Sequence, residues 1–268
     1  SVGRGRIMTV PVHIGGNVRD FVFDTGAAQF NFVSERFARE NGIRMIADSI
    51  PVAGIGRGWV GLGVADSLAV GGIVMRNPVF LISPPDQATD TIEVISAVLG
   101  NAFMRKAERF TIDNRTRHIV FPAERTLHAD GTKRMANMML NSFQPYVRIH
   151  ADGIPLLFHF DTGNVATTLY PPYYELFREQ VDSCGVEDTV RIGGFAGVAE
   201  NVCYRLPSVE FTLEGVPFTL RDIDVLPSGS AGATAGSEAG SLGTDFATAF
   251  DTLTVDYTSC TVLGENVP

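Results

Sequence analysis

The sequence predicts an all-β fold with a few short helices, built from two homologous halves. The chain has 268 residues, among them 28 glycines and 18 phenylalanines, a composition typical of β proteins with many tight turns. The tripeptide Asp-Thr-Gly occurs twice, at residues 24–26 and 161–163, and each copy ends an apolar run. Further landmarks recur at one constant spacing between the halves.

The bulk composition excludes several classes of partner. Hydrophobic residues make up 45% and charged residues 19% of the chain, enough apolar material for a sizeable core. The net charge of −9 and the lack of a Lys/Arg cluster argue against nucleic acid as a partner. No apolar run approaches the roughly 18 residues of a membrane span, so no transmembrane segment is expected. Three cysteines leave two alternatives open, a bridge between Cys184 and Cys203 or unpaired thiols throughout.

Each half is expected to open with strands of alternating polarity that lead into Asp-Thr-Gly. Val10, Val12 and Ile14 alternate with other residues in the first half, and Val147 and Ile149 do so in the second. Alternation with a period of two is typical of a half-buried strand. We therefore predict that both halves are mostly β.

A strand and a short helix are predicted after each Asp-Thr-Gly. In the first half, Ser34 is a plausible N-cap of the helix and Gly42 lies near its end. In the second half, TTLYPPYYELFREQ indicates a strand, then prolines, then a helix. A glycine-rich stretch follows in both halves, AGIGRG at 53–58 and IGGFAG at 192–197, and a hairpin comes after each.

The spacing of the later landmarks indicates a duplicated domain. Three pairs are each 143 residues apart (215 − 72 for the first): Gly72 and Gly215, Gly100 and Gly243, and Asp113 and Asp256. This period is far longer than a solenoid repeat. We predict an N-terminal unit over 1–121, a linker over 122–142 and a C-terminal unit over 143–268.

The two aspartates, Asp24 and Asp161, are the candidate catalytic residues. Two carboxylates a hydrogen bond apart cannot both ionise, so they hold one proton between them. At one pH, one aspartate is then a base and the other an acid. This pair has the groups needed to activate water against an amide.

These features together resemble the aspartic protease family over nearly the whole chain. Each half resembles a retropepsin-type unit, with an apolar strand, Asp-Thr-Gly, a glycine-rich flap, a hairpin and a final apolar pair before glycine. Ala27 follows the first Asp-Thr-Gly as in retropepsins, and both halves have a flap, whereas pepsins have one. The chain is therefore similar to a fused retropepsin-like dimer of bacterial type. This implies two β-barrel-like lobes of the aspartic protease fold, related by a pseudo-twofold axis.

The resemblance implies an aspartic endopeptidase whose dyad is Asp24 and Asp161. The hydroxyls of Thr25 and Thr162 would hydrogen-bond across the pseudo-twofold axis. Substrate would be an extended peptide or protein segment paired with the flaps. The remaining candidate residues support the dyad or line the flaps and the substrate site: Gly26, Gly163, Ile55, Gly56, Trp59, Gly194, Phe195 and His159. No cofactor is implied, a monomer is expected, and the setting is the bacterial periplasm or the exterior, with the cytoplasm as the alternative.

Other interpretations fit parts of the sequence. The main alternative is a catalytically silent peptide-binding protein of the same fold. The glycine-rich stretches can also be plain turns. Gly56, Gly58 and Gly61 match G-x-G-x-x-G, but no helix follows, which argues against a dinucleotide site. The histidines form no metal-binding pattern, and Trp59 can equally well be a packing residue.

His159 lies two residues before Asp161 and so points to the same face of its strand, where the first half has Val22. It lines a substrate pocket or is a structural histidine. In the pocket, protonated His159 would stabilise the ionised dyad and favour acidic substrate groups. Ala27 and Asn164 stand where pepsins have a serine that hydrogen-bonds the carboxylate. Without that bond we expect raised pKa values in the dyad and a mildly acidic optimum.

Overall fold

The computed structural model describes residues 6–28, 30–54, 56–84, 96–122, 135–194, 197–230 and 236–267. Strands dominate these residues and the helices are short, so the predicted all-β class is confirmed. No helix in these ranges is both long and apolar enough to span a membrane. The helices are α1 (Glu35–Glu40), α3 (Asn101–Ala107), α4 (Pro171–Leu176), α5 (Arg178–Cys184) and α6 (Thr244–Ala247).

Nine strands of the N-terminal half form one sheet, in the order β4-β5-β8-β3-β9-β2-β1-β6-β7. Their bounds are β1 (Thr9–Ile14), β2 (Asn17–Phe23), β3 (Asn31–Ser34), β4 (Arg44–Gly54), β5 (Gly56–Val64), β6 (Ser67–Val70), β7 (Ile73–Arg76), β8 (Val79–Ser83) and β9 (Ala97–Leu99). The Ser34 hydroxyl accepts a hydrogen bond from the Phe37 amide at 3.1 Å and caps α1.

Eight strands of the C-terminal half form a second sheet, in the order β12-β13-β14-β19-β15-β18-β17-β16. Their bounds are β12 (Met138–Asn141), β13 (Gln144–Ala151), β14 (Ile154–Phe160), β15 (Thr168–Leu169), β16 (Val186–Gly194), β17 (Gly197–Leu213), β18 (Val216–Val225) and β19 (Gly240–Leu242). Residues 138–141 fall in the predicted linker but pair with β13 instead, with Met138 buried opposite Val147. The sequence pattern missed this strand because its alternation is only four residues long.

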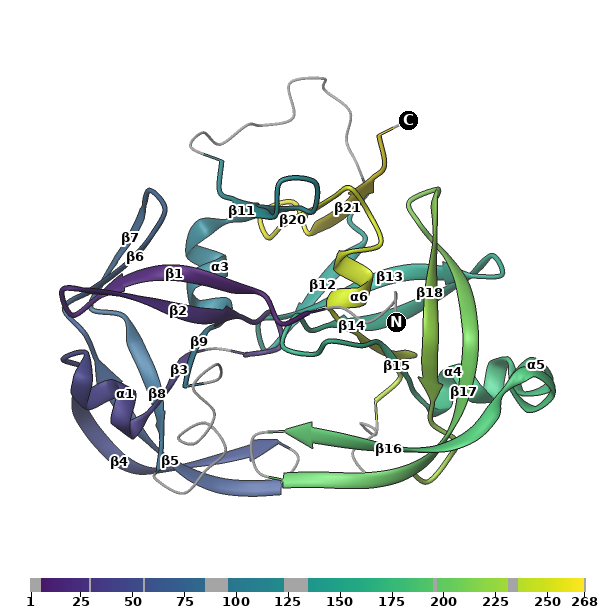
Figure 1. The fold of residues 1–268 in the computed structure, drawn as a ribbon, viewed down its shortest axis with the longest axis horizontal. Coiled ribbons are helices and arrows are strands. Elements are labelled where there is room, and N and C mark those ends of the chain that lie inside the picture. Colours follow the sequence, from purple (N-terminus) through teal and green to yellow (C-terminus); the bar gives the residue numbers. More distant parts are fainter. Residues whose placement is uncertain are drawn as a thin grey trace.

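A third sheet joins the halves at the top of Figure 1. It contains β10 (Arg109–Asp113), β11 (His118–Val120), β20 (Thr252–Asp256) and β21 (Thr261–Glu265), in the order β11-β10-β20-β21. At its centre, Thr111 lies opposite Thr254, and their hydroxyl oxygens are 2.8 Å apart. These two threonines are 143 residues apart, the spacing of the repeat (254 − 111).

The strands around the two Asp-Thr-Gly loops are arranged alike in both halves. Strand β2 runs parallel to β9, which pairs antiparallel with β3; β14, β19 and β15 repeat this arrangement. Phe23 and Phe160, the residues before the aspartates, are fully buried. Their rings pack edge-on against Phe110 and Phe246. Each Asp-Thr-Gly loop therefore starts from a rigid, aromatic core.

Two long hairpins, β4–β5 and β16–β17, carry the glycine-rich stretches. In Figure 1 they extend towards each other at the bottom of the view, opposite the four-stranded sheet. Gly54 pairs with Gly56 at the end of one hairpin, and Gly194 with Gly197 at the end of the other.

All three cysteines are free. Cys184 is exposed at the end of α5, whereas Cys203 is buried on β17 with its sulfur 3.7 Å from Asp224. The alternative of a Cys184–Cys203 bridge is therefore wrong.

Candidate active site

The two Asp-Thr-Gly loops meet where the halves join. Asp24 directly follows β2, and its amide donates to the Leu99 carbonyl on β9 at 3.1 Å. Asp161 directly follows β14, and its amide donates to the Leu242 carbonyl on β19 at 2.9 Å. Each aspartate is thus fixed by the same pair of parallel strands in its own half.

Thr25 and Thr162 tie the loops together through four hydrogen bonds, two between the threonines and two to the opposite strands. The Thr25 hydroxyl donates to the Phe160 carbonyl at 2.7 Å and accepts from the Thr162 amide at 3.0 Å. In return, the Thr162 hydroxyl donates to the Phe23 carbonyl at 2.6 Å and accepts from the Thr25 amide at 3.0 Å. Both side chains are fully buried. Because a buried polar group without a partner is costly, this exchange holds the two loops at a fixed separation.

Gly26 and Gly163 allow each loop to approach the opposite aspartate. A β-carbon added at Gly26 would lie 2.2 Å from the Asp161 carboxyl carbon, and one at Gly163 would lie 2.7 Å from Asp24 Oδ2. Neither distance leaves room for a methyl group. Glycine is therefore required here for close approach, in addition to any need for a sharp turn.

The carboxyl groups of Asp24 and Asp161 interact directly. Burial raises the pKa of Asp24 well above its usual range, and the charge of Asp161 and a hydrogen bond to it raise this pKa further. Burial also raises the pKa of Asp161, but the same hydrogen bond lowers it, followed by the backbone donor Gly163. The two carboxyl groups therefore hold one proton between them.

The hydrogen-bond donors to the two carboxylates differ. Asp24 Oδ1 accepts from the amides of Gly26 at 2.7 Å and Ala27 at 3.1 Å. Asp161 Oδ1 accepts from the Gly163 amide at 2.9 Å, and its Oδ2 accepts from the Asn164 side-chain amide at 2.8 Å. The expectation that Asn164 leaves its carboxylate without a side-chain donor is therefore wrong, because an amide N–H replaces the hydroxyl. Ala27, at the equivalent position of the N-terminal half, has no side-chain donor for Asp24.

Residues far from the motif support the first Asp-Thr-Gly loop. The Asn101 side chain donates to the carbonyls of Thr25 at 2.7 Å and Ala27 at 2.8 Å. Its oxygen accepts from the Tyr257 hydroxyl of the C-terminal half at 2.7 Å. Burial, and then the charge of Asp24, raise the pKa of Tyr257. The sequence analysis identified neither Asn101 nor Tyr257, because no sequence motif connects these two distant positions.

A further contact crosses between the halves. The Gln144 side chain, at the start of β13, donates to the Gly26 carbonyl. The residue 137 positions earlier, the spacing of the two aspartates, is Ile7, which has no such donor (144 − 137; 161 − 24). Aligning the two halves sets polar Gln144 against apolar Ile7, and this difference could have marked Gln144 as a functional residue.

His159 lies on the strand that leads into Asp161, and most of its surface is buried. Burial lowers the pKa of His159, while the charges of Asp24 and Glu238 raise it less. Burial thus disfavours the protonated ring, against the expectation that a protonated His159 stabilises the ionised dyad. The expectation had left out the desolvation of the ring.

The flap candidates are described only in part. Ile55 and Phe195 lie outside the described residues, and Gly56 and Gly194 are described by their backbone pairing alone. Trp59 lies opposite Pro51 in the β4–β5 hairpin and is 62% exposed. Trp59 is thus open to solvent and is not a packing residue.

Residues 10–103 match the protein family described as aspartyl protease. The matched range includes the first Asp-Thr-Gly loop and the strands that hold it. The match supports an aspartyl protease. It also supports a hydrolase of the peptidase class. Among curated protein sequences, none matches the chain.

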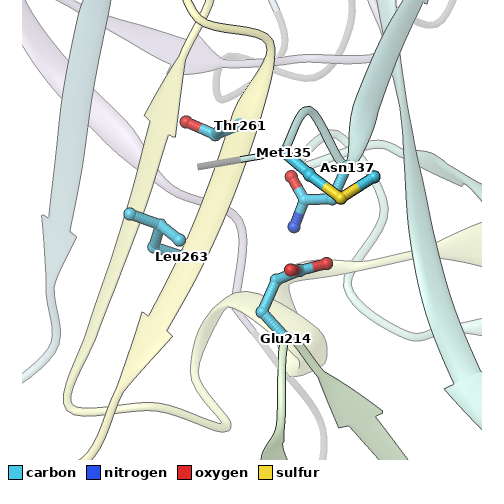
Figure 2. Close-up of a pocket in the computed structure, with 5 residues that line it drawn as sticks. All are labelled: Met135, Asn137, Glu214, Thr261 and Leu263. Atoms are coloured by element: carbon cyan, nitrogen blue, oxygen red, sulfur yellow. The ribbon is translucent and has the colours of Figure 1, made fainter. Parts of the chain in front are cut away.

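A separate pocket of about 220 Å³ lies in the C-terminal half, away from the dyad (Figure 2). It is lined by Met135, Asn137, Glu214, Thr261 and Leu263. Its polar groups are already engaged: the Asn137 side chain bonds both backbone groups of Val262, and Glu214 pairs with Arg148 at 3.1 Å. Within the described ranges, no group of three or more His, Cys, Asp or Glu residues is placed to hold a metal ion.

Proposed function

We propose that the protein is an aspartic endopeptidase that cleaves peptide bonds with water activated by Asp24 and Asp161. The observation that carries this proposal is the direct contact between two buried carboxyl groups with raised pKa values. The interlocked threonines give this contact its geometry. The family match over residues 10–103 supports the same class of activity.

In this proposal the two aspartates take different roles. Ionised Asp161 accepts a proton from water as that water attacks the carbonyl carbon of the peptide bond. Protonated Asp24 hydrogen-bonds the carbonyl oxygen, where negative charge develops. Asp161 then gives its proton to the leaving amine nitrogen as the C–N bond breaks. The products are a free carboxyl group and a free amine.

In this proposal the chain forms two lobes, residues 1–121 and 143–268, joined by the linker 122–142 and related by a pseudo-twofold axis. The paired contacts of Thr25 with Thr162 and of Thr111 with Thr254 support this relation. Because one chain supplies both aspartates, the protein acts as a monomer. Specific activity is expected to stay constant on dilution, and a loss that tracks dissociation in ultracentrifugation would contradict this.

The substrate is an extended segment of peptide or protein that lies between the dyad and the two glycine-rich hairpins. Extended peptides bind by backbone pairing with exposed strands, which these hairpins supply. Trp59, exposed on one hairpin, is placed to contact such a substrate. From the family resemblance we propose a periplasmic or secreted location.

The test is digestion of a randomised peptide library, read by mass spectrometry for new termini, with and without pepstatin. Wild-type protein is expected to cut in a pepstatin-sensitive manner, and Asp24→Asn is expected to leave the library intact. Binding of the peptides by wild-type protein with no new termini would show the alternative, a silent peptide-binding protein. Circular dichroism of each variant controls for folding.

A further inference from the structure

Five polar side chains gather in the C-terminal half beside Asp161, and we call them the polar wall: Tyr146, His159, Tyr170, Glu238 and Ser241. Tyr146 on β13 lies opposite His159 on β14, and their rings are 5.2 Å apart. Ser241 on β19 lies opposite His159 on the other side, with Oγ 3.5 Å from Nδ1. Glu238 and Ser241 are buried, whereas the three ring residues are partly exposed.

Ser241 is the hydrogen-bond neighbour of His159 Nδ1, with its hydroxyl oxygen 3.5 Å away. A hydroxyl oxygen can accept a hydrogen bond from a ring N–H. When Nδ1 carries the proton and donates it to Ser241, Nε2 has a free lone pair. Nε2 is buried and has no hydrogen-bond partner among the described residues. Buried polar atoms usually have a partner, so this acceptor is an unfilled position for a donor.

Carboxyl groups surround the polar wall. Those of Asp24 and Glu238 act on His159, and each raises its pKa. Burial raises the pKa of Tyr170 to about 12, and the charges of Asp161 and Glu238 add to this rise. Asp24, Asp161 and Glu238 each carry a carboxyl group. A cation is therefore stabilised here, and an anion is repelled.

The equivalent positions of the N-terminal half are different. Strand pairing gives three equivalent pairs: Thr9 with Tyr146, Val22 with His159, and Val98 with Ser241. Valine offers no hydrogen bond, so at these described positions His159 and Ser241 stand where the N-terminal half has two apolar side chains. The two residues that flank the cleaved bond therefore meet chemically different surroundings.

We infer that the polar wall is a specificity site for a basic side chain, Lys or Arg, on one side of the cleaved peptide bond. This rests on the proposed endopeptidase function. The ammonium or guanidinium group donates to His159 Nε2, and Glu238 and the dyad balance its charge. An aliphatic side chain leaves Nε2 without a partner, and an acidic one adds a like charge. The opposite side of the dyad, with Val22 and Val98, takes an apolar side chain.

The test uses mixtures of peptides of about eight residues with Lys, norleucine or Glu fixed at a central position and all others randomised. Norleucine keeps the aliphatic chain of Lys without its charge. Mass spectrometry gives the position of each cut relative to the fixed residue. Lys is expected to exceed norleucine about tenfold in kcat/KM on one side of the cut only, with Glu the poorest. Equal rates for Lys and norleucine on both sides would overturn the inference.

Three variants locate the effect. Glu238→Gln is expected to remove most of the preference for Lys over norleucine, and His159→Val, which copies Val22, is expected to reduce it. Glu210→Gln makes the same charge change at an exposed position of β17 and is expected to leave the preference unchanged. A full preference for Lys in both Glu238→Gln and His159→Val would also overturn the inference.

Binding to Asp24→Asn separates this inference from the proposed function. Asparagine at position 24 leaves the Asp161 carboxyl group in place and removes the other carboxyl group of the dyad. The Lys mixture is expected to bind this variant about tenfold more tightly than the norleucine mixture, by calorimetry. That result without any cleavage by wild-type protein would uphold the polar wall and refute the endopeptidase. Cleavage by wild-type protein together with equal binding of the two mixtures would uphold the endopeptidase and refute the polar wall.

Discussion

The two halves hold their aspartates in the same way but surround them with different side chains. Thr25 and Thr162 exchange matching hydrogen bonds, and both aspartate amides bond a leucine carbonyl on the neighbouring strand. By contrast, Asn164 donates to Asp161, whereas Ala27 has no side-chain donor for Asp24. The shared backbone thus places the two carboxyl groups, and the differing side chains give them different hydrogen-bond donors.

The same contrast extends to the support of the loops. From the C-terminal half, Tyr257 reaches Asn101, which holds the first Asp-Thr-Gly loop. From the N-terminal half, the equivalent position is Asn114 (257 − 143), which bonds the carbonyls of Ala247 and Phe250 instead. Tyr257 therefore links the first loop to the four-stranded sheet through Asn101, whereas Asn114 bonds the backbone at and after the end of α6.

The largest effect is expected from a methyl group added at the shared centre. In Gly26→Ala, the new β-carbon meets the Asp161 carboxyl group at 2.2 Å and must displace it. Because catalysis requires the carboxyl groups in place, kcat/KM should fall at least about a hundredfold. Gly163→Ala, at 2.7 Å from Asp24, should act in the same way.

Gly72→Ala is the matched control, since its added β-carbon meets no atom within 4 Å. Activity close to wild type in Gly26→Ala would show that the loops are not in contact as described.

The next effect concerns the threonine exchange. Thr25→Val keeps the shape but leaves the Phe160 carbonyl and the Thr162 amide buried without partners, which should cost about 2–4 kcal/mol in the free energy of unfolding. Thr162→Val should cost about the same, because its bonds are equivalent. Urea unfolding measures both, with Thr25→Ser as the control that retains the hydroxyl. Unequal losses of stability in the two valine variants would contradict the equivalence of the two threonines.

A smaller and one-sided effect is expected at the loop supports. Tyr257→Phe leaves the buried Asn101 oxygen without a donor and should cost about 1–2 kcal/mol in the free energy of unfolding. It should also lower kcat, since Asn101 holds the first loop. Asn114→Ala should cost stability but leave kcat unchanged at a temperature where it is folded. An equal loss of kcat in both variants would remove the distinction between them.

The smallest effect is expected at Asn164, which is exposed. Asn164→Ala removes a donor from ionised Asp161, which disfavours the charged form and raises its pKa. Since Asp161 must be ionised to act as the base, the acidic limb of the pH–rate profile moves to higher pH. On the acidic limb we expect the rate to fall roughly two- to fivefold. Asn164→Ser should restore the limb, and an unmoved limb in Asn164→Ala would separate Asn164 from the dyad.

The sequence predicts the features that the repeat itself carries. The two Asp-Thr-Gly motifs, the helix cap at Ser34 and the constant spacing of 143 residues need no knowledge of contacts. The polar wall could be found only in part, because Ser241 lies 82 residues from its contact His159 and no local pattern links them. His159 itself was found because it shares a strand face with Asp161.

Charge states were the least predictable feature of the site. The sequence places His159 near the dyad but gives no measure of its burial, and burial lowers the pKa of the ring. The sequence predicted that Asn164 leaves its carboxylate without the hydroxyl donor that pepsins have. In the structure, the Asn164 side-chain amide donates to Asp161 instead. Both corrections depend on side-chain geometry at a distance of a few ångströms.

The most direct test of the dyad compares Asp24→Asn, Asp161→Asn and the double variant in one cleavage assay. If the two carboxyl groups act as a unit, each single variant should lose about a thousandfold or more in kcat, and the double variant should lose no more than either. Thermal unfolding of each variant would show that the fold is intact. Substantial cleavage by either single variant, or losses that multiply in the double variant, would contradict the shared dyad.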